Sequence, residues 1–152
     1  MATFALQPAP PLAADGAALA RVLQRAGLAK DSVIRVTGHA GPTAALWLSR
    51  HGYDRAAYVH AHWVATMELV DALLIPHACG ALELADLLQG AKCMREGGVL
   101  IVQTPPNGQG QGHDNVAGLL QALGYEVEHR LSERGRDVCI ARRRGLDFKR
   151  AA

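Results

Sequence analysis

The chain has 152 residues, of which 49% are hydrophobic and 5% are aromatic, and its formal net charge is +2. That length suits one domain with a core of aliphatic side chains. Much of the positive charge falls in the tail 142–150, which leaves a slightly acidic body and disfavours a nucleic-acid interface. A short basic tail is typical of a solubilising end, and a binding arm is the alternative.

Cysteine usage and hydropathy indicate a cytoplasmic protein. Cys79, Cys93 and Cys139 are far apart, odd in number and form no Cys-x-x-Cys pair, as expected of reduced thiols. The N-terminus has no basic segment followed by an apolar run, so we expect no signal peptide. No uncharged apolar run approaches the roughly 20 residues that a membrane span needs, so no membrane partner is expected.

The spacing of apolar residues predicts alternating helices and strands. In the first half of the chain it predicts an extended lead-in over 1–14, a helix between Asp15 and Gly27, a strand over 33–36, a helix over 43–50, a strand over 56–60 and a short connection over 61–70. In the second half it predicts a strand over 71–76, a helix over 80–94, a turn at 96–98 and a strand over 99–103. A flexible loop over 105–114, a helix over 115–123, and strands over 125–131 and 136–142 complete the chain. Asp15 is a suitable N-cap, and Gly27, Gly52 and Gly124 are placed to end helices.

This alternation predicts the fold class. Strands that alternate with helices form a parallel sheet with helices on both faces, and 132–135 joins the last two strands as an antiparallel hairpin. We therefore expect a doubly wound three-layer α/β sandwich over 15–143, followed by a basic tail over 144–152. The connection 61–70 is too short for a helix, a strand and a second helix.

The turn 37–41 is the first candidate site. Gly38 and Gly41 permit positive φ and close backbone approach, and Pro42 suits the first position of a helix. A strand that leads through glycines into a helix directs free N–H groups at one spot, which is the default ligand site of a doubly wound sheet. A turn retained only for packing is the alternative.

The chain resembles the class I S-adenosylmethionine-dependent methyltransferases in several segments. Segment 33–41 lies where that family has its glycine-rich first motif, and 71–74 resembles the fourth strand, which opens on an acidic residue. Segment 87–102 resembles the helix, Gly-Gly turn and fifth strand, and the hairpin 125–142 matches the reversed last strand. The likeness spans 15–143.

This resemblance implies S-adenosylmethionine or S-adenosylhomocysteine as the cofactor. The positions that it assigns to cofactor binding are Thr37, Gly38, His39, Ala40, Gly41, His60 and His77. Arg35 or Val36 takes the place of the acidic residue that opens the first motif. The family's second strand ends in a carboxylate that holds both ribose hydroxyls, whereas 58–62 contains none; a neutral imidazole accepts only one hydrogen bond. The family's third strand is also expected to be missing.

Each predicted parallel strand ends near a histidine. His39, His60 and His77 follow the first three strands, and His113 lies in the predicted loop after the fourth. Because the carboxyl ends of parallel strands meet at one edge, these rings are expected to lie there together. A candidate metal set consists of His60, His62, His77 and Cys79. Imidazole and thiolate suit zinc, and ordinary loop histidines are the alternative.

Two functions are compatible with this pattern. The leading expectation is a methyltransferase-fold domain that has lost methyl transfer and acts as a binding or assembly module. The alternative is an active S-adenosylmethionine-dependent methyltransferase that acts on a small molecule. Without a third strand, the second strand becomes an open edge that invites pairing, so we expect a homodimer or a protein partner at that edge.

Overall fold

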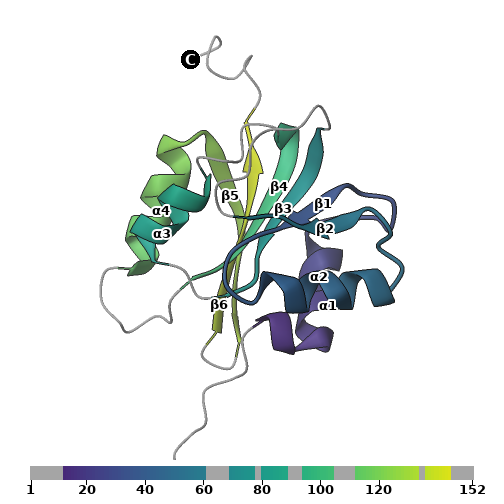
Figure 1. Cartoon of the computed structure of the whole chain (residues 1–152). Coiled ribbons are helices and arrows are strands. Elements are labelled where there is room, and N and C mark those ends of the chain that lie inside the picture. Colours follow the sequence, from purple (N-terminus) through teal and green to yellow (C-terminus); the bar gives the residue numbers. More distant parts are fainter. Residues whose placement is uncertain are drawn as a thin grey trace, which may run out of the picture.

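The computed structural model describes residues 12–60, 69–77, 80–88, 94–104, 112–133 and 136–144, with the backbone alone at 112–115 and 133. Its elements are the 3-10 helix η1 (Leu12–Ala14), α1 (Gly16–Arg25), β1 (Ile34–Val36), α2 (Gly41–Arg50), β2 (Ala56–Tyr58), β3 (Val70–Ile75), α3 (Ala81–Leu88), β4 (Met94–Thr104), α4 (Gly112–Ala122), β5 (Tyr125–Glu133) and β6 (Arg136–Arg143), as Figure 1 shows. The alternation of helices and strands is as predicted.

The described strands form a six-stranded sheet in the order β2-β1-β3-β4-β6-β5. The first four of these strands pair in parallel, and β6 runs antiparallel to both β4 and β5. This topology confirms the predicted fold class, a mostly parallel sheet with an antiparallel C-terminal hairpin strand.

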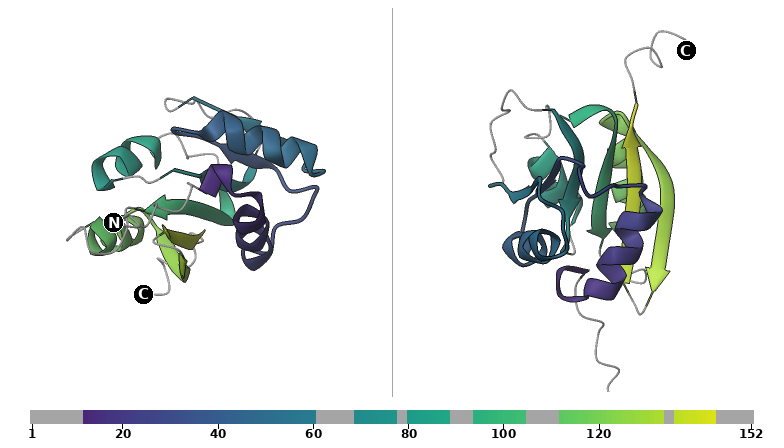
Figure 2. Two further views of the ribbon diagram at one scale, coloured as in Figure 1. Left: turned by 90° about the horizontal axis from the view of Figure 1, so that it is seen from below. Right: turned by 90° about the vertical axis from the view of Figure 1, so that its right-hand side faces the viewer.

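Helices cover both faces of the sheet, with α1 and α2 on one side and α3 and α4 on the other (Figure 2). On the first side, the buried aliphatic residues include Leu19, Leu23, Leu48, Ile34, Leu74, Ile101 and Ile140. On the second side they include Leu84, Leu88, Leu120, Leu73, Leu100 and Val102. Successive residues of β3 and β4 thus face opposite layers, which explains why both strands are apolar on both faces.

Local signals at the helix ends behave as expected. The Asp15 carboxylate accepts a hydrogen bond from the Ala18 amide at 3.1 Å and so caps α1. Gly27, Gly52 and Gly124 adopt φ of 76°, 90° and 91° just beyond three helices, a conformation that glycine adopts without a Cβ penalty.

The prediction of a helix end and a turn over 94–98 is wrong. It belongs to β4, which begins at Met94 and pairs with β3 from Val70 onward. The pairing shifts register between Val70 and Ala72, and Gly97 has φ of 77°. The glycines therefore permit a β-bulge within a continuous strand, because the partner strand β3 holds the backbone on both sides of it.

Two further segments differ from the prediction. Residues 12–14 form a 3-10 helix instead of an extended lead-in, because Leu12 is buried and its N–H donates to the Gln103 side chain at 2.8 Å. His113 lies in α4, which begins at Gly112, and not in a loop.

The predicted absence of a third methyltransferase strand agrees with the described sheet, in which β2 is an edge strand. Most of the connection after β2, residues 61–68, lies outside the described residues. Within the described part of the chain, no helix has the length and apolar character that crossing a bilayer requires.

Candidate functional site

The turn 37–41 connects the carboxyl end of β1 to α2. The Thr37 amide donates to the Leu74 carbonyl at 3.0 Å, and the Gly41 amide donates to the Gly38 carbonyl at 3.1 Å. Gly38 and Ala40 have φ of 86° and 63°. No side chain of the described residues caps α2 at Ala40. Because Pro42 has no N–H and the Ala44 amide donates to the Ala40 carbonyl at 3.3 Å, the Thr43 amide is the first-turn N–H that is left for a ligand among the described residues.

The ring of Tyr58, the last residue of β2, packs against the start of α2. A Cβ placed on Gly41 would lie 2.6 Å from Tyr58 Cε1 and 2.7 Å from Cδ1. Such distances are far below an ordinary carbon–carbon contact of about 3.5–4.0 Å. Gly41 is therefore a glycine because an aromatic ring occupies the space beside it.

Gly38 serves a different purpose. A Cβ there would lie 3.5 Å from Leu87 Cδ1 and 3.6 Å from Ile75 Cγ2, which are ordinary contacts. Its φ of 86° is the constraint, because residues with a Cβ adopt this region at a cost. The turn needs Gly38 for its backbone and Gly41 for its packing.

The structure brings three predicted histidines to the carboxyl edge. The rings of His39 and His77 meet edge to face, with centroids 4.6 Å apart and planes at 78°. The Tyr58 and His60 rings meet in the same way, with centroids 5.6 Å apart. His39 and His77 follow β1 and β3, so the predicted grouping of strand-end histidines is observed for these two. The ring of His60, which follows β2, contacts Tyr58.

The metal hypothesis remains a prediction. His62 and Cys79 lie outside the described residues. Within the described part of the chain, no three histidine, cysteine or acidic side chains are grouped so that they could hold a metal ion.

A buried hydroxyl lies at the base of the turn. Thr37 is 2% exposed, and its Oγ1 has no hydrogen-bond partner among the described residues. A buried polar atom without a partner is uncommon, and no contact among the described residues explains why a hydroxyl is buried at this position.

Comparisons by sequence give no match: no protein-family model matches the chain, and no curated protein does. Solved structures do match. A putative hemolysin from Lactococcus lactis aligns with a TM-score of 0.63 at 10% identity, covering 86% of this chain and 87% of that protein. Magnesium protoporphyrin IX methyltransferase from Synechocystis PCC 6803, solved with bound SAH, aligns with a TM-score of 0.61 at 9% identity, covering 84% and 81%. A SAM-dependent methyltransferase from Aquifex aeolicus gives 0.60 at 10% identity, covering 81% and 87%.

The fold is that of the class I S-adenosylmethionine-dependent methyltransferases. Identities this low show the fold alone. The resemblance places β3 and β4 as the fourth and fifth strands of the methyltransferase fold, and their pairing agrees with this placement.

Among the described residues directly after β1, β2 and β3, none carries a carboxylate. Segments 37–41, 59–60 and 76–77 contain no aspartate or glutamate. Asp71, which the resemblance singled out, is the second residue of β3 and so lies near the amino end of that strand, away from the turns. There its carboxylate accepts from the Val33 amide at 2.8 Å and pairs with Arg95 at 3.2 Å, so its contacts stabilise the sheet.

Two groups outside this edge were missed by sequence reasoning. Burial raises the pKa of the Cys139 thiol above its ordinary value, although the nearby Arg130 charge opposes the shift, so Cys139 is a protonated core residue. Arg136 is buried and pairs with Asp15 at 2.9 Å. Sequence spacing carried no signal for this pair, because its members are 121 positions apart.

Proposed function

We propose that this methyltransferase-fold chain has lost methyl transfer and acts as a binding or assembly module. The observation that carries the proposal is the position of Tyr58. It ends β2, the strand whose end holds the ribose-binding carboxylate in the family that the chain resembles, and its ring packs against Gly41 at the start of α2.

The chemistry of this position supports the proposal. A carboxylate accepts hydrogen bonds from both ribose hydroxyls, whereas a phenol or a neutral imidazole accepts fewer and adds no charge. The phenol ring also packs against the helix start, where a cofactor would approach the Thr43 amide. Both effects weaken the binding of an adenosyl cofactor in the family's usual pose.

Isothermal titration calorimetry with S-adenosylmethionine and S-adenosylhomocysteine tests this proposal. We expect no saturable heat for either ligand up to about 1 mM. A Tyr58→Asp variant, which restores a carboxylate at the end of β2, is the matched comparison and is expected to bind more tightly than the parent. Micromolar affinity of the parent chain for either ligand would overturn the proposal.

The second candidate function is an active methyltransferase for a small molecule. It is favoured by Gly38, which keeps the positive φ of a ligand-binding turn, and by the unpartnered hydroxyl of Thr37 beside it. Methyl transfer needs mainly proximity and orientation, so an unusual pose is sufficient. The same calorimetric titration separates the two functions.

We also propose that the β2 edge is the assembly surface. Ala57 and Tyr58 of this edge strand are exposed in the described structure, and an uncovered edge strand presents backbone groups for pairing. Light scattering at tens of micromolar is expected to report a homodimer or a complex with a protein partner. Ala57→Lys is expected to weaken the dimer, whereas Ala20→Lys on the exposed face of α1 is the control. A monomer at tens of micromolar would count against this surface.

A further inference from the structure

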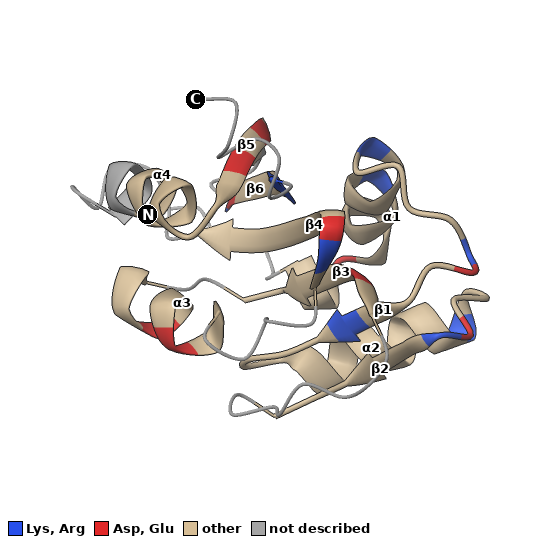
Figure 3. Ribbon diagram, turned by 90° about the horizontal axis from the view of Figure 1, so that it is seen from above, with Lys and Arg blue, Asp and Glu red and all other residues tan. Residues whose placement is uncertain are grey.

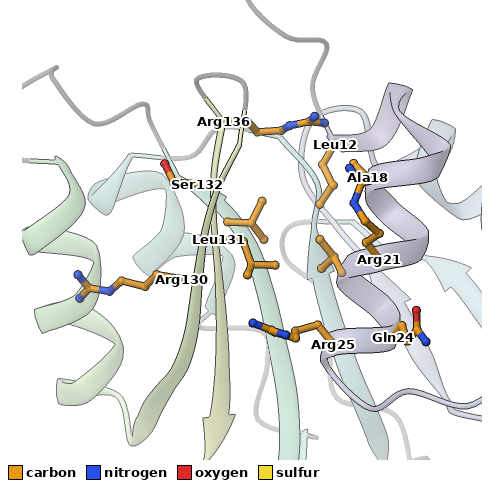
Figure 4. A pocket seen from close by; sticks show the side chains of 11 residues that line it. Leu12, Ala18, Arg21, Gln24, Arg25, Arg130, Leu131, Ser132 and Arg136 are labelled. Carbon is orange, nitrogen blue, oxygen red and sulfur yellow. The ribbon is translucent and has the colours of Figure 1, made fainter.

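A groove of about 720 Å³ lies between α1 and the β5–β6 hairpin, on the sheet face that α1 covers only in part (Figure 4). Its walls and floor include Arg21, Val22, Arg25, Leu131, Arg136 and Val138. None of the residues 37–41 lines it, so the groove is separate from the glycine turn. Its volume falls within the range of small-molecule sites.

Arg136 supplies a buried donor at one end of this groove. Its side chain is 3% exposed, and one guanidinium nitrogen, Nη2, pairs with Asp15 at 2.9 Å. The other terminal nitrogen, Nη1, is buried and has no hydrogen-bond partner among the described residues. The other Asp15 oxygen accepts from the Ala18 amide and so caps α1. Because an unpaired buried guanidinium N–H is costly, this nitrogen favours an acceptor from outside the described chain.

Two more cations come from α1. Arg21 and Arg25 lie one helical turn apart on the same wall, and the Arg25 guanidinium reaches across toward the strands at the far end from Arg136 (Figure 4). Helix α1 contains no acidic residue (Figure 3), and none of the described lining residues is acidic. Arg130 also lines the groove, but its side chain points away from α1 in Figure 4.

The floor between these cations is apolar. Val22, Leu131 and Val138 belong to the hydrophobic cluster beneath α1, and Leu131 is half-buried. Cations at both ends of an apolar floor complement an anionic group attached to an apolar body. Segment 1–11, which precedes Leu12 in the sequence, contains no aspartate or glutamate and so offers no carboxylate side chain to these cations.

We infer that this groove binds an amphipathic organic anion, whose carboxylate or phosphate accepts from Arg136 Nη1 at one end while its apolar body covers Leu131 and Val138, with the positive charges of Arg21 and Arg25 along the α1 wall. This site goes beyond the proposed function. It uses none of the residues of the glycine turn, so the outcome of the cofactor titrations leaves it unaffected.

Fluorescence titration of the full chain with anilinonaphthalene sulfonate, an aromatic anion, tests the inference. We expect saturable binding, displaced by decanoate, by decyl phosphate or by both, which distinguishes a carboxylate site from a phosphate site. The double variant Arg21→Gln/Arg25→Gln is expected to weaken probe binding about tenfold through the loss of two charged donors. Arg50→Gln is the matched control, because Arg50 ends α2 as Arg25 ends α1, and it is expected to bind within about twofold of the parent.

Arg136→Lys tests the anchor, since it keeps a charge beside Asp15 but removes the fork of donors. This variant is also expected to bind the probe more weakly. Cooperative thermal unfolding is the check that the variant is folded. If this variant does not fold, the exposed Arg21 and Arg25 variants decide the question. Amide chemical-shift changes measured by NMR are expected at Val22, Leu131 and Val138.

Any one of several results would overturn the inference. They are the absence of saturable binding, equal binding by the double variant and the Arg50→Gln control, and shift changes centred on the glycine turn instead of the groove. Failure of both decanoate and decyl phosphate to displace the probe would also reject an amphipathic anion as the ligand.

Discussion

Replacing Gly41 with alanine tests the aromatic packing on which the proposed function depends. The new Cβ would lie 2.6 Å from Tyr58 Cε1 and 2.7 Å from Cδ1, an overlap of about 1 Å relative to an ordinary contact. Overpacking of this kind costs about 1–3 kcal/mol. Tyr58 is 38% exposed, so its ring has room to swing outward and we expect the lower part of that range.

An opposing effect must be subtracted from this cost. Alanine favours a helix over glycine by up to about 1 kcal/mol at interior positions, and by less at the first residue of a helix such as α2. We therefore expect Gly41→Ala to lower the free energy of unfolding by about 1 kcal/mol overall. Gly118→Ala is the matched control: this glycine lies inside α4, a Cβ there meets nothing within 4 Å, and the change is expected to stabilise the protein by about 0.5–1 kcal/mol.

Urea unfolding followed by circular dichroism measures these differences. A double-mutant cycle with Tyr58→Ala isolates the clash, because removing the ring removes the obstacle. We expect a coupling energy of about 1–2 kcal/mol between the two positions. If Gly41→Ala matches or exceeds the stability of the parent chain, or if the coupling is absent, then Tyr58 does not pack against the helix start as described.

Three other predictions concern stability and reactivity. Asp15→Ala is expected to lower the free energy of unfolding in urea by about 3–5 kcal/mol, because it leaves the buried Arg136 charge unpaired and removes the cap of α1. A loss below about 1 kcal/mol, which is the size of the cap alone, would show that the ion pair contributes little. Gly38→Ala is expected to cost about 1–2 kcal/mol from its φ of 86°, even though its Cβ meets only ordinary contacts, and an unchanged unfolding midpoint would refute this strain. Burial raises the pKa of Cys139, so the unfolded chain loses the thiol proton before the folded chain does as the pH rises. The free energy of unfolding should therefore fall above the ordinary thiol pKa, and this part of the fall should vanish in Cys139→Ala. A count of reactive thiols in the native proteins, made at neutral pH with a disulfide-exchange reagent, should be the same for the parent and the variant.

Much of the fold could be predicted from local patterns in the sequence. The cap at Asp15 and the terminating glycines 27, 52 and 124 depend on the backbone within a few residues, so their roles are readable from residue type alone. The same is true of β3 and β4, whose apolar character on both faces indicates a central strand. The candidate turn 37–41 was also located in this way, together with the histidines at the ends of β1, β2 and β3.

The segment 94–98 could not be predicted locally. Its two glycines are as typical of a turn as of a bulge, and the choice depends on β3, which pairs with β4 on both sides of the bulge. The 3-10 helix at 12–14 depends in the same way on Gln103, a residue 91 positions away.

The sequence by itself determined the order of the elements, the fold class and the edge at which a site would lie, because these follow from periodicity and chain connectivity. The tertiary structure alone decided that the Tyr58 ring fills the space beside Gly41. It also decided that Arg136 is buried against Asp15, with one nitrogen that has no partner among the described residues. Contacts between distant segments depend on the position and rotamer of side chains that only the packed sheet brings together.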